Sequence, residues 1–149
     1  RDAIEMWARS LQLDSMWTEL PPVTERWVDL DPNSQNAYLI MAQSANQNGD
    51  AERTQMAIQA VDGLEVTVND LQLSRLGNGG AAVSGSLANK TLEPGARVSL
   101  RFTFYANDGT PIGSVTEAVS AGMIDMGQVF QIQFDSAEPV SGYGYEILR

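Results

Sequence analysis

Apolar residues in the first part of the chain recur at helical spacing and predict four helices. In the first, residues 2–13, the side chains of Ile4, Trp7, Ala8 and Leu11 fall at i, i+3, i+4 and i+7 and share one face. Three further helices follow at residues 23–30, 35–48 and 51–61, separated by Pro, Asp and Gly signals. The positions expected to point inward are Trp27, Leu30, Tyr38, Met41, Ala42, Ala45, Ala57, Ile58 and Val61.

The pattern changes near Gly63, where β-branched residues and apolar–polar alternation replace the helical spacing. Turn signals at residues 77–80, 93–95, 107–109 and around Gly122 separate the alternating stretches. These stretches predict about seven strands, at residues 64–68, 71–73, 81–87, 98–105, 112–119, 129–134 and 141–147. Leu100, Phe102 and Phe104 share one strand face, and Phe130, Ile132 and Phe134 share another, which is the pattern of a two-sheet core.

The predicted fold class is therefore α+β, with a short helical domain at residues 1–63 and an antiparallel β-sandwich at residues 64–149. No linker rich in Pro, Ser or charge separates the two domains, so we expect them to pack closely.

The composition excludes several classes of functional site but does not identify a function. The 149 residues include 19 acidic and 9 basic side chains, for a formal net charge of -10, and contain neither His nor Cys. The usual zinc sites, His-dependent triads, thiol nucleophiles and disulfides are therefore excluded. The acidic balance disfavours nucleic acid as a partner. We expect a protein that is not an enzyme and has no cofactor or metal.

No apolar run approaches the roughly 20 residues that span a bilayer, so no membrane span is expected within the chain. Arg1 already falls inside a predicted helix. One expectation is therefore that a signal peptide or membrane anchor preceded Arg1. The lack of Cys fits a cytosolic or a bacterial extracytoplasmic location equally well.

The stretch from Asp31-Pro32-Asn33 to Asp62 resembles a tetratricopeptide repeat. Its matching positions are Ala37, Tyr38, Met41, Ala42, Ala45, Gly49, Asp50, Thr54, Ile58 and Val61, with Ala42 in place of the usual Gly and Ala45 in place of an aromatic residue. The endings at residues 11–15 and 28–32 lie 17 residues apart, half of a 34-residue repeat. Residues 2–14 are thus interpreted as the second helix of a truncated preceding repeat.

This resemblance implies a binding face, because the inner face of the first helix in such repeats often binds peptide. Carried over by position, that face consists of Asn36, Leu39, Gln43, Asn46 and Gln47. Side-chain amides offer both a donor and an acceptor to an extended backbone. The simpler alternative is a polar face that only contacts water.

The second half resembles the FxLYD domain. The matching segments are Val83 to Lys90, Pro94-Gly95, Leu100 to Gly109 and Gly127 to Phe130, although Asp108 comes three residues after Tyr105 instead of directly after it. The resemblance implies a small immunoglobulin-like sandwich, found mostly in bacterial cell-envelope proteins and without known catalysis. Tyr105 faces away from Phe104 and is a candidate partner contact, although a half-exposed strand tyrosine is the commoner case.

Other candidates for chemistry are weak. The acid pairs Asp29/Asp31 and Asp135/Glu138 lie next to Pro or at element ends, where acids cap helices and mark turns. Residues 107–109 lack the later acidic ligands of a calcium loop. Asn89-Lys90-Thr91 matches a glycosylation sequon, which has meaning only in a eukaryotic secretory context.

The three tryptophans all lie within the first 27 residues. Trp7 and Trp27 are expected to pack between helices. Trp17 falls in the irregular stretch 15–20 and is either a lid on the core or an exposed anchor for a partner.

These observations favour a non-enzymatic interaction or scaffold module. The expected partner is a protein in a larger membrane-anchored assembly, for example an electron-transfer or photosynthetic complex, on the outer side of a bacterial cytoplasmic membrane. The alternative is a peptide- or glycan-binding domain of a larger secreted enzyme. A third hypothesis is a hydrolase that works with acids alone.

Overall fold

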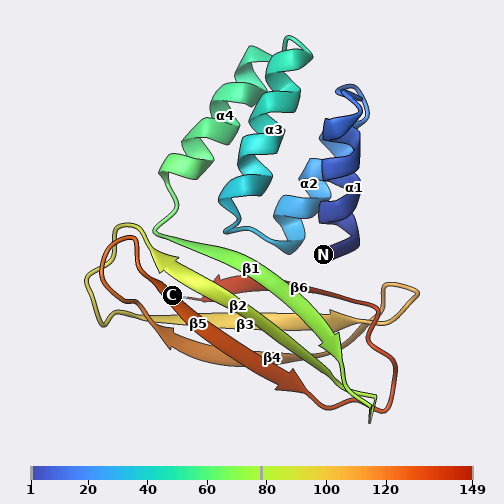
Figure 1. The fold of residues 1–149 in the computed structure, drawn as a ribbon, viewed down its shortest axis with the longest axis vertical. Coiled ribbons are helices and arrows are strands. Elements are labelled where there is room, and N and C mark those ends of the chain that lie inside the picture. Colours follow the sequence, from blue (N-terminus) through green and yellow to red (C-terminus); the bar gives the residue numbers. More distant parts are fainter. Residues whose placement is uncertain (1, 78, 149) are drawn as a thin grey trace. The chain divides into compact units, whose positions relative to one another are not determined.

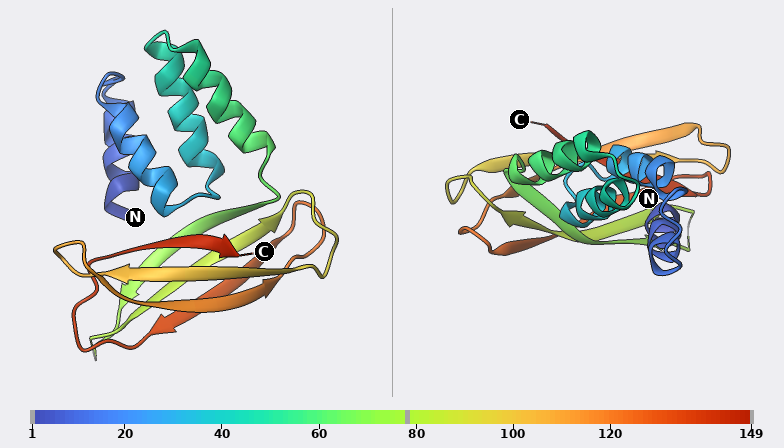
Figure 2. Two further views of the ribbon diagram at one scale, coloured as in Figure 1. Left: turned by 180° about the vertical axis from the view of Figure 1, so that it is seen from behind. Right: turned by 90° about the horizontal axis from the view of Figure 1, so that it is seen from above.

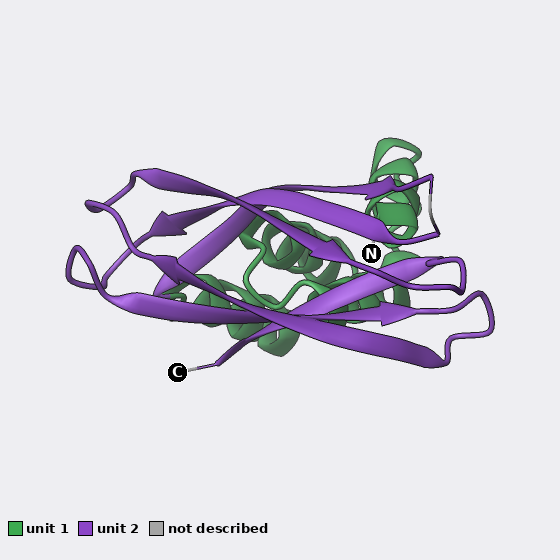
Figure 3. Cartoon of the chain, turned by 90° about the horizontal axis from the view of Figure 1, so that it is seen from below, with its two compact units in different colours: residues 1–64 green, residues 65–149 purple. Residues whose placement is uncertain are grey.

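The computed structural model describes residues 2–77 and 79–148. The chain divides into two compact units, Arg1–Leu64 and Glu65–Arg149 (Figure 3). The first is helical and the second consists of strands (Figures 1 and 2). This order confirms the predicted α+β class.

The helical unit contains α1 (Asp2–Leu13), α2 (Leu20–Leu30), α3 (Gln35–Gln47) and α4 (Ala51–Asp62). The predicted bounds hold to within a residue except at α2, which begins three residues earlier than expected. Pro21 and Pro22 lie in its first turn, where backbone N–H groups have no helical partner in any case. Ser34 and Asp50 cap α3 and α4 by accepting hydrogen bonds from the N–H groups of Ala37 and Arg53.

Neighbouring helices pack in chain order, and α1 also touches α3. Their core joins α1, α2 and α3; its buried members are Ala8, Leu11, Leu20, Val23, Trp27, Ala37 and Ile40. The hairpin partner of α1 is thus α2, which follows it.

Two apolar side chains expected in the helical core are exposed. Trp7 is 55% exposed because it lies at the margin of the α1 face, and Ala8 and Leu11 fill the contact with the other helices. Ile58 is 43% exposed because α4 packs mainly against α3, and only Ala57 of α4 is buried. Trp27, in contrast, is fully buried as expected.

The second unit has six antiparallel strands, β1 (Val66–Arg75), β2 (Ala81–Asn89), β3 (Arg97–Tyr105), β4 (Pro111–Ser120), β5 (Gly127–Phe134) and β6 (Gly142–Leu148). They form two sheets with the orders β1-β2-β5 and β4-β3-β6. The predicted count of about seven is one too high. The stretches predicted at 64–68 and 71–73 fall in one strand, which begins at Val66. This strand bulges where Asp70 adopts a φ of +57° and the register shifts between Asn69 and Gln72.

The two sheets meet through the aromatic faces that the alternation predicted. Phe102 of β3 lies 5.9 Å from Phe130 of β5 between ring centroids, and Phe104 stacks on Phe134 at 4.6 Å. Phe102, Phe104 and Leu100 are fully buried, and each such side chain contributes about 1.5–3 kcal/mol by leaving water.

Two of the predicted turns connect neighbouring strands as expected. The β3–β4 turn at residues 107–109 is held by the Ala106 N–H, which donates to the Thr110 carbonyl, and by Gly109 with a φ of +85°. In the β1–β2 turn, the Leu76 N–H donates to the Gly80 carbonyl and Gly79 has a φ of +98°. Asn78, the remaining member of that predicted turn signal, lies outside the described residues.

Candidate functional site

The predicted binding face lies along α3, and its five residues share one side of the helix. Asn36, Leu39, Gln43, Asn46 and Gln47 are all exposed, whereas Ala37, Ile40, Ser44 and Ala45 occupy the buried side. The 3.6-residue period of the helix accounts for this separation. The face therefore presents four amide side chains around one apolar residue, Leu39, which is 46% exposed.

The α3 face continues onto α1 through an amide pair. The Gln12 side-chain nitrogen donates to the Gln43 side-chain oxygen at 2.7 Å. Sequence reasoning missed Gln12, because a contact between residues 31 positions apart leaves no local signal. The pairing orders Gln43 and leaves its amide nitrogen available to donate to a ligand.

Trp17 is half-buried and packs against the helical core, in the manner of a lid. Its carbonyl oxygen accepts hydrogen bonds from the Ser44 hydroxyl at 3.3 Å and from the Asn48 side-chain nitrogen at 2.8 Å. These bonds fix the α1–α2 connection to α3. Tyr105 is also half-buried, but it lies at the end of β3 in the other unit. The structure therefore brings Trp17 to α3 and does not place Tyr105 within the same unit.

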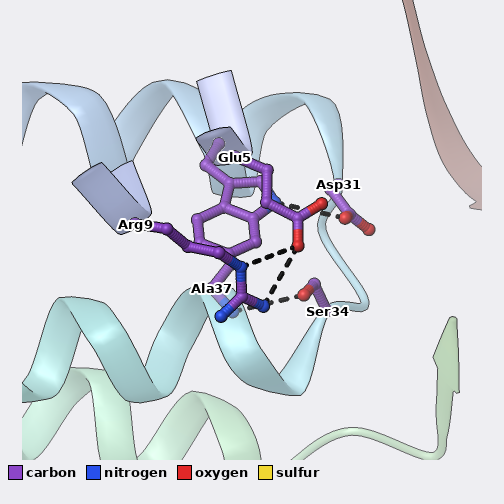
Figure 4. A network of polar contacts seen from close by, with 6 residues as sticks. Glu5, Arg9, Asp31, Ser34 and Ala37 are labelled. Atoms are coloured by element: carbon purple, nitrogen blue, oxygen red, sulfur yellow. Dashed lines mark hydrogen bonds and ion pairs between the residues drawn. The ribbon is translucent and has the colours of Figure 1, made fainter. Parts of the chain in front are cut away.

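A polar network surrounds the buried indole of Trp27 (Figure 4). The Arg9 guanidinium lies 5.8 Å from the ring centroid, and its Nε donates to Glu5 at 3.1 Å. On the other side, the Trp27 indole N–H donates to the Asp31 carboxylate at 3.3 Å. These contacts link α1 to α2 and to Asp31, the residue that follows α2.

The acid pairs are not arranged as paired catalytic groups. Asp31 is fully buried and binds Trp27, while Asp29 is exposed. Asp135 and Glu138 are both exposed, and Ser136 bonds the backbone of Glu138 within a turn. Among residues 2–77 and 79–148, no three acidic side chains approach closely enough to hold a metal ion together.

Asn89, the first residue of the sequon, is fully buried at the end of β2. Its side-chain nitrogen donates to the carbonyls of Leu92 and Gly122 at 2.6 and 2.8 Å. A sugar would replace one of the two hydrogens on this buried nitrogen and break at least one of the bonds, so the folded chain has no room for a sugar there.

A small hollow also opens between α2, α3 and α4, with a volume of about 10 Å³. This is close to the space that one water molecule requires. Its lining residues include Pro21, Thr24, Glu25, Met41, Ser44 and Arg53. The Glu25–Arg53 ion pair crosses its rim, so the amide face on α3 remains the better candidate for a larger ligand.

Tyr38 gives the helical unit a pH dependence. Burial, with the nearby charges of Asp29 and Asp31, raises the pKa of the Tyr38 phenol above its ordinary value of 10.0. The phenol also donates to the Pro32 carbonyl at 3.1 Å. Because the folded state resists ionisation, its stabilisation is complete below the unfolded pKa and is lost as pH rises through the folded pKa.

We therefore expect the free energy of unfolding to fall on alkaline titration, starting near about pH 10. The Tyr38→Phe variant should lose this part of the pH dependence, because Phe has no proton to release. Urea unfolding at a series of pH values, followed by the circular dichroism signal of the helices, measures the free energy of unfolding of the variant and the parent. Identical alkaline slopes for the variant and the parent would contradict the assignment.

Comparisons with known proteins leave the function to be argued from these residues. No protein-family model matches the chain, and a search of curated proteins finds no match. Among solved structures, a DUF1425 family member from Shewanella sp. pv-4 is similar with a TM-score of 0.46 and 14% identity, over 56% of this chain and 77% of its own. A putative β-galactosidase from Bacteroides fragilis has a TM-score of 0.32 and 15% identity, over 54% of this chain and 15% of its own. Likenesses this low carry no argument about function.

None of the helices in the described part of the chain is long and apolar enough to cross a bilayer.

Proposed function

We propose that this chain is a non-enzymatic interaction module that holds a protein partner on the amide face of α3. The observation that carries the proposal is the exposure of Asn36, Gln43, Asn46 and Gln47 on one side of the helix. Four amides in a row offer alternating donors and acceptors, which suit the backbone of an extended peptide. Leu39 supplies an apolar contact among them.

Two proposed resemblances, of the helices to a tetratricopeptide repeat and of the strands to the FxLYD domain, support an interaction module. We interpret α3 and α4 as a tetratricopeptide-like hairpin, since Gly49 has the left-handed φ of +73° at the corner and Asp50 caps the next helix. We interpret the second unit as an FxLYD-like sandwich. A Cβ on Gly85 of its β2 strand would lie 2.8 Å from Leu71 and 2.9 Å from Phe130, so the Gly of the motif has a packing reason.

The proposed setting is the bacterial cell envelope, on the periplasmic or extracytoplasmic side, as an accessory subunit of a membrane-anchored assembly. An electron-transfer or photosynthetic complex is one example. The FxLYD-like segments support this setting. A net charge of -10 favours partners with a basic surface.

The test is a triple variant, Asn36→Ala, Gln43→Ala and Asn46→Ala, in the full chain. Because Ala is the best helix former and the three side chains are exposed, the variant should keep the parent fold, although it loses the Gln12–Gln43 hydrogen bond. We expect retention of a partner from solubilised native membranes to fall by at least about tenfold, since each lost hydrogen bond contributes about 1 kcal/mol.

The matched control is Gln55→Ala with Gln59→Ala, which removes two exposed amides from α4. This control should bind as the parent does. Unchanged retention of every partner by the triple variant would show that the amide face only contacts water.

A further inference from the structure

The loop between β4 and β5, residues 121–126, exposes unusually many large apolar side chains. Met123, Ile124 and Met126 are 65%, 49% and 55% exposed, and Val129, just inside β5, is 84% exposed. No other seven-residue stretch of the described chain carries as many exposed large apolar side chains. Such a patch marks a surface that loses water on association. We call residues 121–126 the methionine loop.

The methionine loop is held in this conformation from inside the sandwich. The buried Asn89 side chain donates to the Gly122 carbonyl at 2.8 Å, and the Asn89 carbonyl accepts from the Asp125 N–H at 2.7 Å. Within the loop, the Met126 N–H donates to the Met123 carbonyl at 3.0 Å. A loop fixed in advance loses little conformational freedom when it binds.

The charge of Asp125 in the methionine loop limits the kinds of surface that can cover the loop. Asp125 stands between Ile124 and Met126 with a left-handed φ of +65°, and its side chain is 73% exposed. Lys90 lies on one side of it, with a nitrogen-to-oxygen distance of 3.4 Å. Any surface that covers the methionines must therefore also accommodate this carboxylate.

A bilayer and a second copy both fit poorly. Insertion into lipid would carry the Asp125 carboxylate with the apolar side chains, and anionic headgroups repel a chain of net charge -10. Two copies would repel each other for the same reason.

We propose that the methionine loop docks into an apolar pocket of a protein partner that carries a Lys or Arg at the pocket rim. The unbranched methionine side chains adapt to the pocket. The rim cation faces Asp125 and competes with Lys90 for it. This site lies on the β unit and does not rest on the α3 face, so the two proposals can fail separately.

The experiment places the photo-cross-linker p-benzoylphenylalanine at Met123 in the full chain, expressed in the native cell. The matched control places it at Asp108, in the exposed β3–β4 turn. We expect a cross-link from position 123 and none from position 108. The cross-linked partner peptide, identified by mass spectrometry, should be apolar with an adjacent Lys or Arg.

Affinity for the identified partner then separates the two contributions. Met123→Ser with Met126→Ser should weaken binding more than tenfold. Asp125→Asn keeps a residue that tolerates the left-handed conformation and should weaken binding and reduce its salt dependence. Both variants change exposed side chains, so circular dichroism should match that of the parent.

Each of the following results would overturn the proposal. The first is equal cross-linking from positions 123 and 108. A cross-linked partner peptide without a basic side chain would count in the same way. The second is loop-dependent sedimentation with vesicles of phosphatidylcholine and phosphatidylglycerol, which would assign the loop to a membrane. The third is a loop-dependent dimer in sedimentation velocity, which would assign it to a second copy.

Discussion

Replacing Asn89 with Ala should lower the free energy of unfolding of the β unit by roughly 3–6 kcal/mol. Asn89 is fully buried, and its side chain makes three hydrogen bonds, to the carbonyls of Leu92 and Gly122 and from the N–H of Leu92. The variant leaves these three backbone groups without their partner. Each unsatisfied buried group costs about 1–3 kcal/mol.

Urea unfolding followed by the near-ultraviolet signal of the β-unit aromatic residues measures this change. The control is Asn107→Ala, which removes an exposed asparagine from the β3–β4 turn and should cost less than about 1 kcal/mol. Comparable losses for the two variants would mean that Asn89 does not secure the loops around it. In a separate measurement, hydrogen exchange at the Asp125 N–H should speed up in the Asn89 variant, because the loss of the side-chain bond to the Gly122 carbonyl loosens the loop that carries Asp125.

Trp27→Ala should destabilise the helical unit by roughly 3–5 kcal/mol, the range for truncating a large buried aromatic side chain. Trp27 is fully buried where α1, α2 and α3 meet. The change leaves a cavity, and it also removes the indole N–H from the buried Asp31 carboxylate. The circular dichroism signal of the helices, followed during urea unfolding, measures the decrease in the free energy of unfolding.

Two further variants separate these effects and provide the control. Trp27→Phe fills part of the cavity but lacks the N–H donor, so its residual loss is an upper limit for the contribution of the bond to Asp31. Trp7→Ala removes a tryptophan that is 55% exposed and should cost less than about 1 kcal/mol. If Trp7→Ala were as damaging as Trp27→Ala, the assignment of the helical core would be wrong.

Much of the fold could be predicted because its signals are local. Helical spacing placed α1, α3 and α4, and alternation placed Phe102 opposite Phe130. The count of seven strands in place of six shows what local signals cannot predict. A bulge at Asp70 looks like a strand end in the sequence, but pairing with β2 resumes beyond it and keeps β1 continuous.

The candidate surfaces were predicted less completely. The exposed face of α3 followed from helix periodicity, whereas its partner Gln12 did not. The methionine loop had no sequence signal beyond a turn near Gly122, since apolar residues are ordinarily expected inside. Only the structure shows that Met123 and Met126 are exposed, in a loop that hydrogen bonds to Asn89 hold in place.

The sequence by itself determined the class, the order of elements and the faces that turn inward, because periodicity and turn chemistry act over a few residues. The tertiary structure alone decided which marginal apolar side chains are covered. Trp7 and Ile58 remained exposed because α1 buries Ala8 and Leu11, and α4 buries Ala57, against their neighbouring helices. It also decided the use of Asn89, because its partner Gly122 lies 33 residues away. Contacts over such distances depend on how whole segments pack, which no local pattern encodes.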